Sequence, residues 1–201
     1  MNGDKTFPAH KADMLNDERR LASLSEEELL GLLDLHGEEN VADLGSGTGF
    51  YTDRIAARTT GTVYAVELQP EMQARHRERG VPSNVSLVLS DIEDLPLGPG
   101  SIQRAVSINA LHEAHSPEGL AQVARALSAG GLFVVVDWRR APEAASRGPR
   151  LEHRLTKEEA LALLAPWFEP VQAYDLTDYF VAVVRRRDDL QAAVSPNGNG
   201  A

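Results

Sequence analysis

Three glycines follow a short apolar segment within five residues, in Asp43-Leu44-Gly45-Ser46-Gly47-Thr48-Gly49-Phe50. Glycines in a turn let the backbone approach a ligand closely, because no Cβ stands in the way. A dinucleotide-binding turn, G-x-G-x-x-G, would need glycine where Phe50 stands, and a phosphate-binding loop would need a lysine that is absent here. The turn therefore suits a ligand that needs close backbone contact but carries no diphosphate group.

Three acidic residues accompany this turn at the ends of consecutive strand-like segments. Asp43 lies just before the turn, Glu67 ends the second segment, and Asp91 follows the third. In an open α/β sheet such strand ends meet at one edge, where ligands bind, and an acid at the second strand end can hydrogen-bond a ribose. Three carboxylates around a glycine turn predict a pocket for a neutral or cationic nucleoside.

These residues need a framework, and the hydropathy pattern predicts strands that alternate with helices. Only three residues separate the last two strand segments, so a hairpin makes the final strand antiparallel to its neighbour. We predict a Rossmann-like, doubly wound α/β fold with a mostly parallel seven-stranded sheet and a C-terminal antiparallel hairpin strand. The predicted strands cover residues 41–44, 62–67, 85–89, 102–108, 132–136, 171–176 and 180–184.

Capping residues mark several helix boundaries. The segments Ser25-Glu26-Glu27-Glu28 and Thr156-Lys157-Glu158-Glu159 have the spacing of capping boxes, which open helices. Ser116-Pro117 is a further helix start. We expect Gly130-Gly131 to end the helix that starts there and to lead into the strand at 132–136.

The length of 201 residues suits one domain with a substantial core. The alternating pattern places that domain at residues 25–187. The segment 1–24 is expected to form part of an active-site lid, and the tail at 188–201 is expected to be disordered. Candidate lid contacts to a substrate are Phe7, His10 and Met14.

Charge and composition exclude several classes of function. The chain has 30 acidic and 20 basic residues, a net charge of −10, so we expect neither nucleic acid nor an anionic membrane as a partner. The absence of cysteine excludes thiolate metal sites and cysteine nucleophiles, and no metal site is expected. No apolar run reaches the roughly 18 residues of a membrane helix. The charged N-terminal region shows no secretory signal, so a cytoplasmic protein is expected. The sequence leaves the oligomeric state open.

The order of the motifs resembles that of the class I S-adenosylmethionine (SAM)-dependent methyltransferases, over about residues 25–187. The resemblance is closest to the small-molecule branch that includes quinone-biosynthesis enzymes. SAM has a ribose, an adenine, a sulfonium and an ammonium but no phosphate, and so fits the predicted pocket. The motifs are 41–49 (first motif), 63–67 (ribose-binding strand), 90–96 (adenine-binding segment), 107–113 (after the fourth strand) and 126–132 (the L-x-P-G-G turn, with Ala129 replacing proline).

The resemblance implies cofactor-binding roles for residues in these motifs. Gly45 and Gly47 would pass close to the methionine part of SAM, with Asp43 facing its ammonium group. Glu67 would bind the ribose hydroxyls. The other implied cofactor-binding residues are Ser46, Thr48 and Gly49 in the turn, Leu68 and Asp91 at the adenine, the backbone of Ile92 beside the ring, and the backbone of Asn109 near the transferable methyl group.

The resemblance also implies methyl transfer from SAM to a small-molecule acceptor, which gives S-adenosylhomocysteine. The sulfonium is already activated, so the protein mainly positions the acceptor, and a general base is needed only where the acceptor loses a proton. The candidate catalytic residues are His112, Glu113, Asp137 and His153. His112-Glu113 does not complete the zinc motif H-E-x-x-H, because position 116 is serine.

Two alternatives stay open at the level of sequence. The domain could bind SAM without catalysis, as a sensor or partner protein. A nicotinamide-dependent reductase is the other alternative, but the chain lacks both the G-x-G-x-x-G turn and a Tyr-x-x-x-Lys pair. The short segment at 141–150 leaves little room for a protein-recognition insert, which favours a small acceptor.

Overall fold

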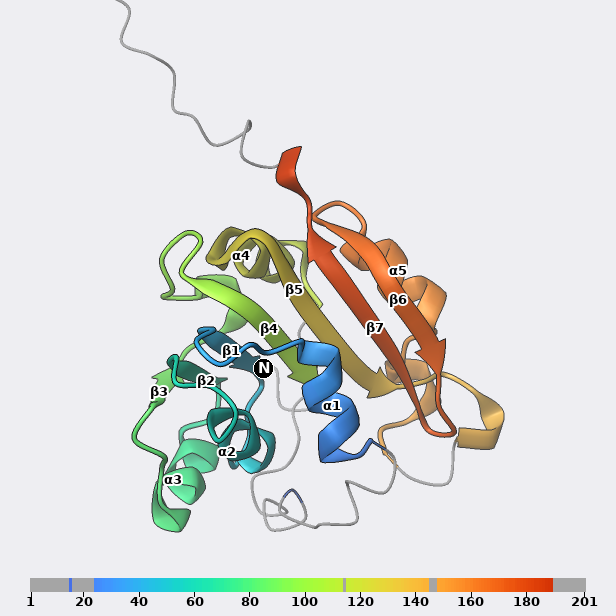
Figure 1. Ribbon diagram of the computed structural model, residues 1–201. Helices are drawn as coiled ribbons and strands as arrows, with labels where there is room; N and C mark the ends of the chain where they lie inside the picture. Colours follow the sequence, from blue (N-terminus) through green and yellow to red (C-terminus); the bar gives the residue numbers. More distant parts are fainter. Residues whose placement is uncertain (1–14, 16–23, 114, 145–147, 190–201) are drawn as a thin grey trace, which may run out of the picture.

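The computed structural model describes Leu15 and residues 24–113, 115–144 and 148–189. Seven strands in these ranges form one sheet in the order β3-β2-β1-β4-β5-β7-β6 (Figure 1). The strands from β3 to β5 are parallel, and β7 is antiparallel to both β5 and β6. The strands are β1 (Val41–Leu44), β2 (Val63–Glu67), β3 (Val85–Leu89), β4 (Ile102–Ile108), β5 (Leu127–Trp138), β6 (Phe168–Asp175) and β7 (Tyr179–Arg186). The predicted fold class and C-terminal hairpin are confirmed.

Helices cover both faces of the sheet, with α1, α2 and α3 on one side and α4 and α5 on the other (Figure 1). Each face has its own cluster of buried apolar side chains: α1 and α2 pack on one cluster, α4 and α5 on the other. The helices are α1 (Glu26–Leu33), α2 (Phe50–Ala56), α3 (Pro70–Arg79), α4 (Pro117–Ala126) and α5 (Lys157–Leu164). The short 3-10 turns are η3 (Ile92–Asp94), η4 (Pro142–Ala144) and η5 (Leu151–His153).

Both predicted capping boxes are present. At the start of α1, the Ser25 side chain accepts a hydrogen bond from the Glu28 backbone amide, and the Glu28 carboxylate accepts one from the Ser25 backbone amide. Thr156 and Glu159 make the same reciprocal pair at the start of α5. These local hydrogen bonds satisfy backbone donors that a helix N-terminus would otherwise leave unpaired.

The prediction that Gly130-Gly131 separates a helix from a strand is wrong. Helix α4 ends at Ala126, and β5 begins at once with Leu127 and runs through both glycines. The pairing of β5 with β4 shifts register in this stretch, and Gly130 has a φ of +70°. The glycines therefore serve an irregularity inside a long strand, where a residue without Cβ is favoured.

Several expectations lie mostly outside the described residues. The lid expected at 1–24, its contacts Phe7, His10 and Met14, and the tail beyond residue 189 stay predictions. Leu15 is described: its Cδ1 lies 3.2 Å from where a Cβ on Gly47 would be, so this residue sits against the glycine turn. Within the described ranges, we find no helix with the length and apolar character that a bilayer crossing requires.

Candidate functional site

The glycine turn between β1 and α2 has a backbone that other residues would strain. Gly45, Gly47 and Gly49 have φ values of +75°, +57° and +81°, which L-residues with a Cβ rarely adopt. The amides of Gly45 and Ser46 both donate to the Val66 carbonyl of β2. A Cβ on Gly45 would lie 2.5 Å from the Ala110 Cβ, so the turn abuts the segment that follows β4.

Glu67, the last residue of β2, holds this turn from the neighbouring strand. Its two carboxylate oxygens accept hydrogen bonds from the backbone amides of Gly47 and Gln69, each at 2.8 Å. The residue is 7% exposed, and burial raises its pKa even though these amide donors favour the charged form. The charge of Glu113 adds to this upward shift. A fixed carboxylate with further lone pairs is suited to accept hydrogen bonds from ligand hydroxyls.

Asp43 is more enclosed than the sequence prediction assumed. The side chain is 3% exposed, and its Oδ2 accepts a 2.6 Å hydrogen bond from the Thr52 hydroxyl of α2. This contact ties β1 to the helix that follows the turn. Asp43 therefore lies buried directly before the glycine turn, with its carboxyl group oriented by Thr52.

The residues expected at the adenine lie at the ends of β2 and β3. Leu68 is 51% exposed, directly after Glu67. Asp91 is exposed, and its Oδ1 accepts a 3.0 Å hydrogen bond from the Glu93 amide, which caps η3. The partly buried Ile92 side chain packs toward Gly119 of α4. An apolar side chain and a carboxylate thus flank the same sheet edge.

Two buried polar atoms lack a hydrogen-bond partner among the described residues at this edge: Ser46 Oγ in the glycine turn and Asn109 Oδ1 after β4. Asn109 has a φ of +57°, and its amide donates to the Val136 carbonyl of β5 at 2.8 Å. Buried polar atoms are nearly always satisfied in proteins. One of these atoms lies in the turn and the other in the segment after β4, and a ligand with donors and acceptors at this edge would satisfy both.

Three of the four candidate catalytic residues come together at the carboxyl ends of β4 and β5. Asp137, which is 0% exposed, accepts hydrogen bonds from His112 Nδ1 and the His112 amide, each at 2.8 Å, and from the Trp138 amide at 2.7 Å. On the other side of the ring, His112 Nε2 lies 3.6 Å from Glu113 Oε1. The imidazole is thus held between a buried carboxylate and a more exposed one.

The pKa of His112 reflects this arrangement. Burial alone would lower it, but the hydrogen bonds and charges of Asp137 and Glu113 outweigh burial and raise the pKa to about 9. With Nδ1 directed at Asp137, the neutral ring carries its lone pair on Nε2. Below about pH 9 the ring is therefore an imidazolium between two carboxylates, and above that pH the neutral ring is a base whose orientation is fixed by Asp137.

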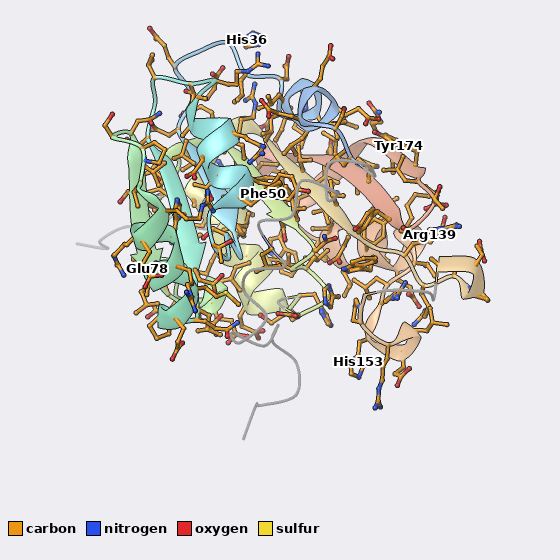
Figure 2. The ribbon with its side chains drawn as sticks, turned by 90° about the horizontal axis from the view of Figure 1, so that it is seen from below. His36, Phe50, Glu78, Arg139, His153 and Tyr174 are labelled. Carbon is orange, nitrogen blue, oxygen red and sulfur yellow. The ribbon has the colours of Figure 1, made fainter. Side chains whose placement is uncertain are left out.

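The fourth candidate, His153, is not part of this group. It is exposed on η5, and Figure 2 shows it at the periphery of the molecule, away from Phe50, which follows the glycine turn. Among the described residues, no hydrogen bond or ion pair joins His153 to the other three candidates, and its catalytic role stays a prediction.

Sequence reasoning missed a second histidine–carboxylate pair, which lies behind the glycine turn. His76 of α3 is 0% exposed, and its Nε2 lies 2.7 Å from Asp53 Oδ1 of α2. Arg79 donates to Asp53 Oδ2 and to the Thr48 carbonyl, each at 2.6 Å. No motif spacing marks these residues, since they meet only when α3 packs beside α2.

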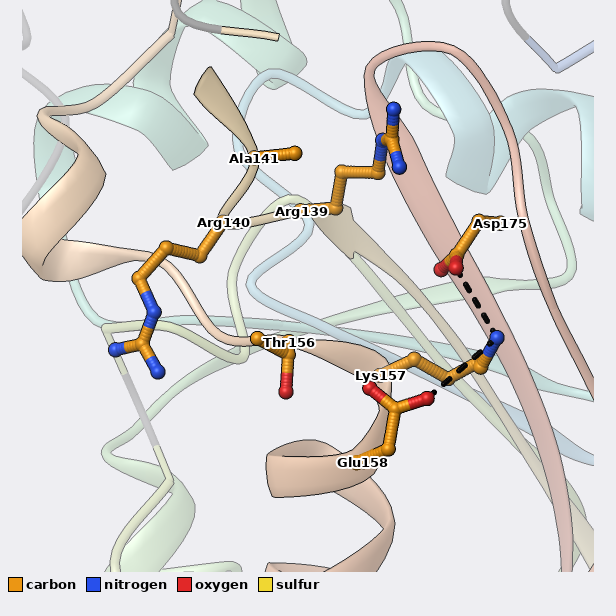
Figure 3. A pocket seen from close by; sticks show the side chains of 7 residues that line it. All are labelled: Arg139, Arg140, Ala141, Thr156, Lys157, Glu158 and Asp175. Atoms are coloured by element: carbon orange, nitrogen blue, oxygen red, sulfur yellow. Dashed lines mark hydrogen bonds and ion pairs between the residues drawn. The ribbon is translucent and has the colours of Figure 1, made fainter. Parts of the chain in front are cut away.

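A small cavity of about 160 Å³ lies between the end of β5 and the start of α5, where three basic side chains gather (Figure 3). Each of the three forms an ion pair. Lys157 Nζ contacts Asp175 and Glu158, Arg139 contacts Glu143, and Arg140 contacts Glu159. Because these cations are already compensated, the cavity supports no separate anion site.

The comparisons with known proteins agree with this geometry. The family described as "Methyltransferase domain" matches residues 41–131, from β1 into β5. Malonyl-[acyl-carrier protein] O-methyltransferase of Laribacter hongkongensis is 33% identical over 115 residues, 51% of this chain and 39% of the relative. Dimethylglycine N-methyltransferase of Parasynechococcus marenigrum is 30% identical over 102 residues, 48% of this chain and 36% of the relative. The chain thus spans well under half the length of these curated relatives.

A solved structure is similar over nearly the whole fold. The SAM-dependent methyltransferase from Aquifex aeolicus superposes with a TM-score of 0.83 at 22% identity, covering 90% of this chain and all of that one. The fold is therefore that of the class I SAM-dependent methyltransferases. Residues 41–131 match the methyltransferase-domain family, which confirms the resemblance drawn from the motifs.

Proposed function

We propose that this protein transfers a methyl group from SAM to a small-molecule acceptor and releases S-adenosylhomocysteine. The observation that carries the proposal is the buried carboxylate of Glu67, which is fixed against the glycine turn by the amides of Gly47 and Gln69. The matched methyltransferase domain supports the same reaction.

The residues present fit SAM. Glu67 would accept hydrogen bonds from the ribose hydroxyls, and Asp91 with Leu68 would lie at the adenine. The backbone of Gly45 and Gly47 would pass the methionine part. The two buried atoms without partners among the described residues, Ser46 Oγ and Asn109 Oδ1, would be satisfied by a ligand rich in polar groups. The acidic side chains favour a cation over a diphosphate.

When bound, SAM supplies a methyl group on a positively charged sulfur, so the transferred group is already activated. The protein's own residues hold the acceptor in line with that methyl group and exclude water. The acceptor would lie beyond the ends of β4 and β5, beside His112 and Asp137. By name, one of the two relatives methylates oxygen and the other methylates nitrogen. The relatives therefore do not determine which atom of the acceptor receives the methyl group here.

Calorimetric titration with SAM and S-adenosylhomocysteine tests the proposal. We expect saturable binding of both, and formation of S-adenosylhomocysteine when a library of small metabolites is added. Absence of binding at millimolar cofactor would overturn the proposal. Binding without turnover on any acceptor would instead support the non-catalytic sensor.

A further inference from the structure

His112 and Asp137 form a buried, hydrogen-bonded pair that is not needed merely to align an acceptor with the methyl group of SAM. Asp137 is fully buried and receives three hydrogen bonds, two of them from His112. Burying a charged pair is costly unless it is well compensated, and such pairs are concentrated at functional sites. An acceptor that arrives without a proton to lose, such as a carboxylate or a tertiary amine, has no use for an oriented base.

We propose that His112 Nε2 removes the proton from a hydroxyl group of the methyl acceptor, so that the substrate class is phenols and enols. This inference rests on the methyl transfer proposed above. Phenolic hydroxyls have a pKa of about 10, within reach of an imidazole base, whereas ordinary alcohols are far less acidic. An imidazole base therefore favours acceptors with acidic hydroxyl groups, such as phenols and enols, over ordinary alcohols.

The step balances in atoms and charge. The acceptor oxygen forms a bond to the methyl carbon with one of its own electron pairs. The bond from methyl carbon to sulfur breaks, and its electron pair stays on sulfur, which becomes a neutral thioether. The hydroxyl proton moves to His112 Nε2, so the positive charge lost at sulfur reappears on the imidazolium, where Asp137 stabilises it.

The location of the pair supports this role. Segment 109–113 carries His112, and within that segment Ala110 abuts Gly45 of the glycine turn. The charge of Glu113 also acts on Glu67, the proposed ribose ligand. These two contacts, one steric and one electrostatic, place the segment that carries the base directly beside the cofactor loop.

Glu113 provides the route for the proton to leave. Its Oε1 lies 3.6 Å from His112 Nε2, and its side chain is 23% exposed against 7% for His112. After each transfer, the imidazolium can pass its proton to this carboxylate and on to solvent. Glu113 is therefore a positioning and relay residue, while His112 is the base.

The test uses His112→Asn, whose amide can still donate to Asp137 but has no nitrogen in place of Nε2. His115→Asn is the matched control, since His115 follows shortly after His112 in the chain and its Nδ1 is within hydrogen-bond distance of the Leu111 carbonyl. The probes are 4-methylphenol, which is protonated at neutral pH, and 4-nitrophenol, which ionises readily without a base. Methyl ether formation and SAM affinity are measured for each protein.

We expect wild type and His115→Asn to methylate both phenols. His112→Asn should lose about 100-fold or more on 4-methylphenol but less than tenfold on 4-nitrophenol, and a SAM affinity close to that of wild type will show that the variant is folded. For wild type, the rate on 4-methylphenol should rise with pH and level off near pH 9, where the imidazole becomes neutral. For the variant, which depends on phenolate formed in solution, the much lower rate should keep rising toward the phenol's own pKa of about 10.

Equal losses on the two phenols would overturn the inference, because the histidine would then act on something other than the hydroxyl proton. A wild-type protein that binds SAM but methylates carboxylates or tertiary amines and no phenol would overturn it as well. Failure of wild type to bind SAM would instead overturn the methyltransferase proposal itself.

Discussion

His76 and Asp53 meet 2.7 Å apart behind the glycine turn, although 23 residues separate them in the sequence. A Cβ added to Gly49 would lie 2.3 Å from the His76 ring, so the ring rests directly on the turn. Asp53 is also bound by Arg79, which donates to the Thr48 carbonyl. Helix α3 thus fixes the turn from behind while Glu67 fixes it from the ligand side.

This relationship predicts that His76 affects cofactor affinity without touching the cofactor. His76→Phe keeps the ring against Gly49 but removes the hydrogen bond to Asp53, so the turn should be held less firmly. We expect about tenfold weaker binding of S-adenosylhomocysteine, measured by calorimetry. His76→Gln, which can still donate to Asp53, should restore most of the affinity. Arg75→Gln, on the exposed side of α3, should bind as wild type does; a loss there equal to that of His76→Phe would contradict the prediction.

Glu67→Gln should weaken SAM binding about 10- to 100-fold, since hydrogen bonds to a charged acceptor contribute roughly 1.5–3 kcal/mol each. Burial raises the pKa of this carboxyl, so the charged form is held at a cost in the folded protein. Removing the charge should therefore lower affinity far more than stability. Calorimetry and urea unfolding measure the two effects, with Glu71→Gln on the exposed start of α3 as control. Unchanged affinity would mean that the ribose binds elsewhere.

Gly49→Ala and Gly31→Ala should change stability in opposite directions. At Gly49 the φ of +81° and the contact with His76 both oppose a side chain, and we expect a loss of about 2–4 kcal/mol. Gly31 lies inside α1 with nothing within 4 Å of its added Cβ, so alanine should stabilise by up to about 1 kcal/mol. Chemical denaturation measures the free energy of unfolding of both variants. If Gly49→Ala were no less stable than wild type, the prediction of a strained backbone and a clash with His76 at this position would be wrong.

The stability of the protein should depend on pH through His112. Its pKa is raised to about 9 from an ordinary 6.5, despite burial, by Asp137 and Glu113. A raised pKa means that the folded state holds the proton more tightly than the unfolded chain does. The resulting stabilisation is complete below about pH 6.5 and is lost as the pH rises to about 9.

The wild type should therefore exceed His112→Asn in free energy of unfolding by more at pH 6 than at pH 9.5. The expected change in that difference is on the order of 3 kcal/mol. Urea titrations at the two pH values give the difference directly. A gap that does not change with pH would show that the imidazole is not stabilised as a cation in the folded protein.

Local patterns in the sequence were enough to predict the architecture and the cofactor edge. The short apolar runs between helical segments predicted the seven strands, and the capping boxes at Ser25 and Thr156 predicted two helix starts. Both signals can be read from sequence because they depend on residues only a few positions apart. The start of β5 was missed, since Gly130 serves an irregularity that depends on pairing with β4. Glycine marks a helix end and a strand bulge equally well in sequence.

The order of the motifs by itself determined that the glycine turn and Glu67 would share one edge, because parallel strands bring their carboxyl ends together. Only the tertiary structure decided which side chains pair there. His112 meets Asp137 across 25 residues, His76 meets Asp53 across 23, and His153 lies apart from both. Such pairs depend on how helices and loops pack on the sheet. This packing brings together residues that are far apart in the sequence, and no regular spacing of residue types predicts it.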